Sequence, residues 1–164
     1  MDNVTSKGVT PFRVGFVPGV MPGKWERIWR ERMTRRLQLV PVEVADQEGA
    51  LRASRVEMCL VRGEVDRDVF HLIPLYREVP VVVVPVDHPV TAYDEIDVSE
   101  LDDDLPIMPL SLARLRQRKD LAFRPVTGVA ESPVGLAWPR DRDDPDIQAF
   151  IGIVRGRTAR SSRG

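Results

Sequence analysis

The residues best suited to ligand chemistry lie in a glycine-containing loop after the first apolar segment. Residues 18–23 read Pro-Gly-Val-Met-Pro-Gly, and Lys24 adds a positive charge directly after them. Glycine lets a backbone approach a ligand closely, and the N–H groups at the start of a helix favour an anion. The same residue types occur in any strand-to-helix turn, so a purely structural loop is an equal alternative. The candidate ligand contacts of this loop are Pro18, Gly19, Val20, Met21 and Lys24.

Two later loops offer further candidates. Asp46 and Gln47 follow the second apolar segment, and Arg62 follows the third. A guanidinium can bind a carboxylate through two parallel hydrogen bonds. For Asp46 the role of a helix cap is favoured over that of a ligand contact. Since the chain contains 21 arginines, a surface salt bridge explains Arg62 as well as a ligand does.

The sequence offers no catalytic constellation. Cys59 lies in an apolar run, where an inert buried thiol is favoured over a nucleophile. His71 and His88 are not spaced with Cys59 or with a carboxylate as metal ligands or as a nucleophile and its base. The glycines match no phosphate-binding or dinucleotide-binding pattern. We therefore expect no enzyme, no catalytic residue, no metal and no cofactor.

In the segments that must position these loops, the spacing of apolar residues alternates between the period of a strand and that of a helix. The pattern predicts strands at 12–17, 37–44 and 56–61, separated by a helix with Trp25, Ile28, Trp29 and Met33 on one face and by a short helix at 47–53. This order favours parallel strands with right-handed crossovers, an α/β sandwich. Further strands are predicted at 71–77, 79–86, 121–126 and 133–138, and helices at 111–118 and 147–154.

Composition narrows the class of protein. The chain has 164 residues, of which 43% are apolar and 30% charged, with a formal net charge of −1. This balance is typical of a globular protein and excludes an overall cationic nucleic-acid-binding surface. A single cysteine fits a reducing compartment. Because the sequence has neither a long apolar run nor a secretion-signal core, we expect a cytoplasmic protein with no membrane partner.

The order of the segments resembles the effector-binding domain of bacterial LysR-type transcriptional regulators. The resemblance rests on Gly15, on Glu-Gly-Ala-Leu at 48–51, on residues 75–84, on Asp-His-Pro at 87–89 and on LPIMPLSLAR at 105–114. It covers most of residues 12–154. The fold that it implies is an α/β, type 2 periplasmic-binding-protein-like sandwich.

The resemblance implies a function in transcription regulation. A small metabolite, anionic or aromatic, would bind between two lobes, and the first lobe would form a homodimer through its opening helix and second strand. Val20 and Met21 stand where the family often places Ser or Thr, which favours a different ligand, a more apolar one, or none. The alternatives are a dimerisation module that no longer senses a ligand and, third, a small enzyme on the same fold. The expected dimer contacts are Trp25, Ile28, Trp29, Met33 and Leu39.

Two departures from the family pattern shape the expected domains. Only eleven residues precede Phe12, so DNA binding would require a winged helix-turn-helix that this sequence does not include. The acidic segment 94–104 runs almost directly into Leu105, so we expect a nearly complete first lobe and a reduced second lobe. The predicted parts are a flexible tail at 1–11, a first lobe at 12–86 and 133–154, a second lobe at 87–132 and a basic tail at 155–164.

Overall fold

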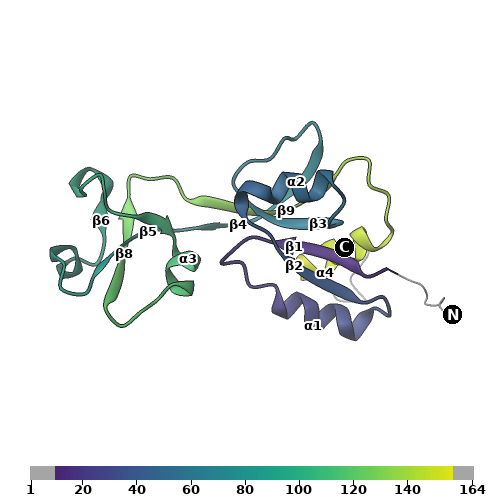
Figure 1. Cartoon of the computed structure of the whole chain (residues 1–164), viewed down its shortest axis with the longest axis horizontal. Coiled ribbons are helices and arrows are strands. Elements are labelled where there is room, and N and C mark those ends of the chain that lie inside the picture. The colour runs from purple at the N-terminus through teal and green to yellow at the C-terminus, as the bar shows by residue number, and fades with distance from the viewer. Residues whose placement is uncertain (1–9, 157–164) are drawn as a thin grey trace. The chain divides into compact units, whose positions relative to one another are not determined.

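The computed structural model describes residues 10–156 and divides into two compact units (Figure 1). The first unit comprises the chain up to Val61, residues Val65–Ile73 and the chain from Leu136 onward. The second comprises Arg62–Glu64 and Pro74–Gly135. The two predicted tails lie outside the described residues, except for residues 10–11 and 155–156.

The first unit is built on a five-stranded sheet with the order β2-β1-β3-β9-β4. Strand β1 pairs in parallel with both β2 and β3, as the alternation of strands and helices predicted. The strands are β1 (Phe12–Phe16), β2 (Leu37–Pro41), β3 (Met58–Arg62), β4 (Phe70–Glu78) and β9 (Ser132–Pro139). The helices are α1 (Gly23–Arg32), the 3-10 turn η1 (Val44–Asp46), α2 (Gln47–Arg52) and α4 (Asp146–Val154).

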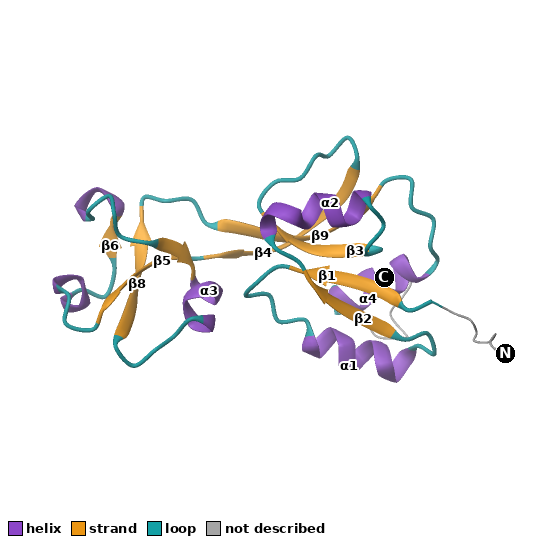
Figure 2. Ribbon diagram, in the orientation of Figure 1, coloured by secondary structure: helices purple, strands orange, loops and turns teal. Residues whose placement is uncertain are grey.

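Alternation along β1 divides the core of this unit into two layers (Figure 2). Phe12 faces α1 and α4, where its ring lies 5.1 Å from that of Trp29 and 6.3 Å from that of Phe150, centroid to centroid. Gly15 points to the opposite face, toward Cys59. Cys59 packs there in a fully buried apolar cluster with Leu51 of α2. The period-two pattern of this strand therefore separates two different cores.

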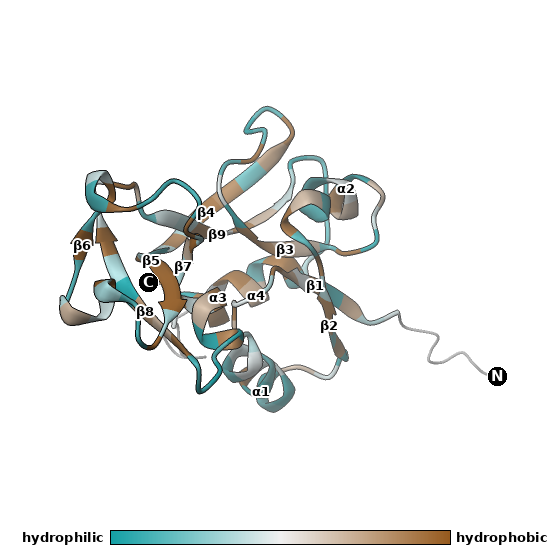
Figure 3. Cartoon of the chain, turned by 60° about the vertical axis from the view of Figure 1, so that its left-hand side comes forward, coloured by the Kyte–Doolittle hydropathy of each residue, from teal (hydrophilic) through white to brown (hydrophobic). Residues whose placement is uncertain are grey.

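The second unit contains a four-stranded sheet with the order β6-β8-β5-β7. Its central strand β5 is strongly apolar (Figure 3) and runs antiparallel to both β7 and β8. The strands are β5 (Pro80–Pro85), β6 (Ile96–Asp97), β7 (Ile107–Pro109) and β8 (Leu121–Thr127). The helical segments are η2 (Pro89–Ala92), η3 (Val98–Glu100) and α3 (Leu110–Leu115). The unit has its own core of buried residues, namely Val82, Val84, Val90, Ile96 and Val126.

Two sequence-based expectations need correction. The predicted first lobe ended at residue 86, but the chain enters the second unit at Pro74, and β5 forms the centre of the second sheet. The predicted strand 37–44 stops at Pro41, because the following residues turn into η1. A continuous apolar run does not reveal which of two sheets will pair with it, and this is why β5 was misplaced.

Candidate ligand and interface sites

The loop between β1 and α1 has the backbone geometry that its two glycines suggested. Gly19 has a φ of 91°, in the left-handed region that favours glycine. Val20 is buried and its backbone N–H donates to the carbonyl of Val17 (3.2 Å), whereas the Met21 side chain is 76% exposed. The loop therefore presents Met21 to solvent and uses Val20 to anchor itself.

Lys24 lies in the first turn of α1, exposed to solvent. Its Nζ is 5.3 Å from the centroid of the neighbouring Trp25 ring. At this distance the ring attracts the ammonium weakly and leaves its three donors accessible. The loop therefore combines an exposed thioether with an exposed cation.

The second candidate loop follows β2 and lies at the same edge of the sheet, because β1 and β2 are parallel. Asp46 occupies the position before α2, as predicted, but its side chain makes no capping hydrogen bond. The preceding turn η1 runs directly into α2, and the backbone N–H of Gln47 donates to the carbonyl of Val44. Gln47 is 5% exposed. Of the two residues, only Asp46 offers its side chain to solvent.

Arg62, the third candidate, is buried in an ion pair of the second unit. Its Nε donates to Oε1 of Glu78 at 2.7 Å, and its Nη2 donates to Oγ of Ser111 at 3.3 Å. The Ser111 hydroxyl donates in turn to Oε2 of Glu78. The salt bridge allowed by the sequence is thus present, but it is buried and not on the surface.

The predicted dimer residues divide into two groups. Trp25 and Trp29 are 8% and 1% exposed and belong to the core, where Trp29 packs against Phe12 and Phe150. Ile28, Met33 and Leu39 are only partly buried. The helical spacing predicted Trp25, Ile28, Trp29 and Met33 on one stripe, although α1 ends at Arg32 and Met33 is extended. The spacing does not distinguish the part that a monomer buries from the part left for a partner.

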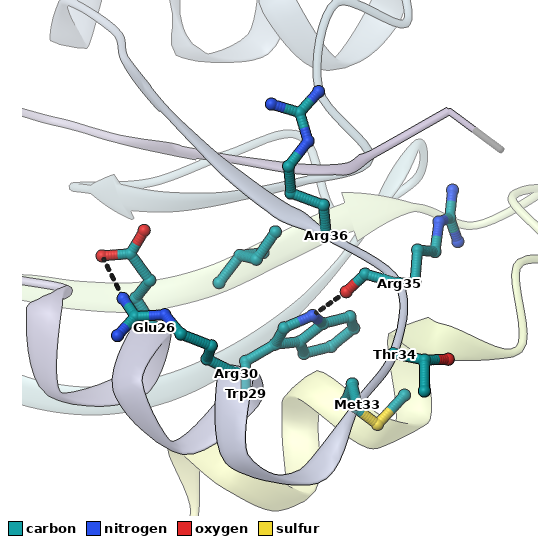
Figure 4. A pocket seen from close by; sticks show the side chains of 8 residues that line it. Glu26, Trp29, Arg30, Met33, Thr34, Arg35 and Arg36 are labelled. Carbon is teal, nitrogen blue, oxygen red and sulfur yellow. Dashed lines mark hydrogen bonds and ion pairs between the residues drawn. The ribbon is translucent and has the colours of Figure 1, made fainter. Parts of the chain in front are cut away.

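A surface hollow of about 420 Å³ lies between the end of α1 and the start of β2 (Figure 4). Trp29, Met33 and Leu37 contribute its apolar lining. Two pairs of its polar groups contact each other: the Trp29 indole N–H donates to the Arg35 carbonyl (2.6 Å), and Glu26 lies 3.8 Å from Arg30. Because four of its eight lining residues are charged, namely Glu26, Arg30, Arg35 and Arg36, the hollow is mixed in character and does not by itself favour an apolar occupant.

Sequence reasoning did not single out Glu78 or Ser111. The available signal was one carboxylate between the strand pattern of residues 71–77 and that of 79–86, with an arginine at the end of an apolar strand. A buried charge is expected to be paired. The pairing itself depends on Arg62, Glu78 and Ser111 meeting within the second unit, although Arg62 is 16 and 49 positions from its two partners.

Cys59 is buried, and this burial raises the pKa of its thiol to about 12. His88 accepts a hydrogen bond at Nδ1 from the backbone N–H of Val90 (3.1 Å) and so stabilises a turn. Among residues 10–156, no group of three or more His, Cys, Asp and Glu side chains is arranged to hold a metal ion. No helix in that range is long and apolar enough to cross a membrane.

Comparison with solved structures identifies the fold. The OxyR regulatory domain C-to-D mutant from Pseudomonas aeruginosa superposes with a TM-score of 0.71 at 17% identity, covering 90% of this chain and 95% of that one. The BenM effector-binding domain with its effector benzoate gives 0.68 at 14%, covering 88% and 90%. Full-length CbnR in complex with target DNA gives 0.69 at 14%, covering 94% and 71%. The fold is that of type 2 periplasmic-binding-protein-like regulatory domains.

Part of the sequence also matches a known protein family. The family described as LysR substrate binding domain matches residues 26–106, from α1 of the first unit to the start of β7 in the second. Residues 26–106 therefore belong to the LysR substrate-binding-domain family, as the order of the segments indicated. A search of curated proteins found no match to the sequence.

Proposed function

We propose that this chain is the ligand-sensing and dimerising domain of a LysR-type transcriptional regulator, and not an enzyme. The observation that carries the proposal is the family match over residues 26–106 on a fold shared with effector-binding domains. BenM, whose effector-binding domain is structurally similar, has been solved with benzoate. We infer that the ligand here is a small anionic or aromatic metabolite. We further propose that the protein is cytoplasmic, since a bacterial regulator that binds DNA through a winged helix-turn-helix works there.

The proposed ligand contacts of the first unit lie after β1 and β2. Met21 and Lys24 supply an exposed thioether and an exposed cation, and Asp46 lies at the same sheet edge. Helix starts and loops at the carboxyl ends of parallel strands are common places for ligands. An aromatic carboxylate suits this chemistry, because its ring would pack on Met21 and its charge would face Lys24.

Thermal denaturation in the presence of candidate acids tests sensing directly. Benzoate and a set of aliphatic dicarboxylates are titrated at constant ionic strength. A ligand that binds only the folded chain at 100 times its Kd stabilises it by about 2.7 kcal/mol. Lys24→Gln is expected to weaken the effect of the active acid at least tenfold, whereas Arg27→Gln, on an exposed part of α1, leaves it unchanged. If no acid stabilises the chain, the sensing role is wrong.

We further propose a homodimer in which Ile28, Met33 and Leu39 meet a second copy. These residues are partly exposed apolar side chains, and Met33 also lines the 420 Å³ hollow. The backbone of β2 argues against a dimer formed by extending the sheet. Because the Arg36 carbonyl and the Val42 N–H bond to β1, the odd-numbered residues of β2 face its open edge.

Pro41 is one of these odd-numbered residues, and it has no N–H to donate. Side-chain packing is therefore the mode of contact that we propose. Light scattering is expected to give about twice the 18.5 kDa chain mass. Met33→Glu is expected to give the monomer, while Arg27→Glu stays dimeric. A monomeric wild-type chain at 100 μM would exclude this part of the proposal.

The alternative is a dimerisation module that does not sense a metabolite. The burial of Arg62 by Glu78 favours it, because the arginine best suited to a ligand carboxylate already has one inside the protein. The two measurements above separate the readings: a dimer that no acid stabilises supports this alternative, and a dimer stabilised by one acid supports the sensor.

A further inference from the structure

The buried ion pair of the second unit has the composition of a carboxylate-binding site. Arg62 comes from the end of β3, Glu78 from the end of β4 and Ser111 from the first turn of α3. The side chains of Arg62 and Glu78 are 8% and 7% exposed. One oxygen of the carboxylate accepts from the guanidinium at 2.7 Å, and the other accepts from the hydroxyl.

This donor set does not depend on the carboxylate being part of the chain. A guanidinium and a hydroxyl that converge on the two oxygens of one carboxylate would hold a free acid in the same way. Burial strengthens both hydrogen bonds, because low-dielectric surroundings screen them little, and it raises the cost of removing the carboxylate that they hold. The site therefore has a strong preference for being occupied by a carboxylate.

We propose that Glu78 is a built-in ligand that occupies a carboxylate-binding site formed by Arg62 and Ser111, and that this site accepts a small free monocarboxylate when the Glu78 side chain is removed. In the resting chain the site is closed to metabolite acids. If the proposed sensor binds an acid, the acid then contacts the loops after β1 and β2. The inference does not depend on the proposed function, because it concerns only which carboxylate occupies this site.

The size of the missing group selects the probe. Glu78→Ala removes the Cγ methylene and the carboxylate beyond Cβ, a group the size of acetate, so formate and acetate fit within that space. Benzoate is much larger than the removed group and serves as a size control. Chloride, at the same ionic strength, controls for general screening of charge.

The experiment measures the thermal midpoint of the full chain with increasing sodium formate, acetate, benzoate or chloride at pH 7. Glu78→Ala is expected to have a lowered midpoint that formate or acetate raises saturably by about 3 °C or more. Chloride is expected to have no such effect on this variant, and benzoate is expected to raise its midpoint no more than it raises that of the wild-type chain. The wild-type chain is expected not to respond to formate or acetate. The double variant Glu78→Ala/Arg62→Met is expected to lose the response, because its site has no cation.

Refolding provides the readout if Glu78→Ala does not fold in chloride. The variant is then diluted from urea into acetate or into chloride, and folded protein is quantified by circular dichroism. Folding in acetate alone supports the proposal. A Glu78→Ala chain that gains nothing from formate or acetate over chloride in either assay overturns it, as does equal rescue of the double variant. Neither result bears on whether the wild-type chain senses a metabolite, which the Lys24 titration decides.

Discussion

The indole of Trp29 lies face to face with the ring of Phe12, with the ring planes inclined by 7° and the centroids 5.1 Å apart. This stacking joins α1 to β1 and places Trp29 inside the first unit. Phe150 of α4 completes the cluster at 6.1 Å from Trp29. One face of α1 thus has two parts. Trp29 packs in the core of the first unit, whereas the adjacent Ile28 remains partly exposed.

Trp29→Ala is expected to lower the free energy of unfolding by about 3–5 kcal/mol, since it removes a fully buried aromatic ring and leaves a cavity. Urea denaturation followed by circular dichroism measures this. Ile28→Ala, on the adjacent and only partly buried position, is expected to cost much less. Equal losses in the two variants would show that Trp29 is not a core residue.

Gly15→Ala is expected to destabilise the chain by about 1–3 kcal/mol, because a Cβ there would lie 3.0 Å from both Cys59 Sγ and Val42 Cγ2. Gly49→Ala is the matched control. Its Cβ would meet nothing within 4 Å inside α2, so it is expected to stabilise by about 0.5–1 kcal/mol. Urea midpoints measure both changes in stability, and changes of the same sign would show that crowding at Gly15 does not set the cost of its substitution.

The Cys59 thiol is expected to resist alkylation in the folded chain. Burial raises the pKa of Cys59 to about 12, so almost no thiolate exists at pH 8 and the sulfur is inaccessible. Iodoacetamide is expected to label the chain at least a hundredfold faster in 6 M urea. Since the raised pKa favours the protonated folded state, this contribution to stability is present below about pH 9 and is lost as the pH rises toward 12. Fast labelling under native conditions would contradict the burial of Cys59.

Tyr76 is expected to report the charge of Glu78. Burial and the negative charge of Glu78 raise the pKa of Tyr76 above its ordinary value, while Arg62 opposes the shift. Glu78→Gln is therefore expected to lower the pKa of Tyr76. The absorbance of tyrosinate measures this in a Tyr93→Phe background, where Tyr76 is the one remaining tyrosine of the chain. An unchanged titration would mean that the Glu78 charge does not act on Tyr76.

The local elements could be predicted well from the sequence. The apolar residues of 12–61 predicted β1, α1, β2, α2 and β3, because a strand or helix that buries one face repeats its apolar residues with the period of that element. The boundary between the units could not be predicted in this way. Strand β5 is apolar on both faces in either sheet, and only the antiparallel register of Val81 with Met108 and of Val83 with Phe123 places it in the second unit.

The same distinction between local pattern and tertiary contact applies to the candidate site. The sequence by itself determined the family, the loops after β1 and β2 and the expectation that Cys59 is inert, because each depends on residue type and near neighbours. Only the tertiary structure decided that Trp29 is core and that Arg62 is already bound by Glu78 and Ser111. Those contacts join residues 16 to 121 positions apart, and no local pattern encodes which distant side chain will satisfy a buried ring or a buried charge.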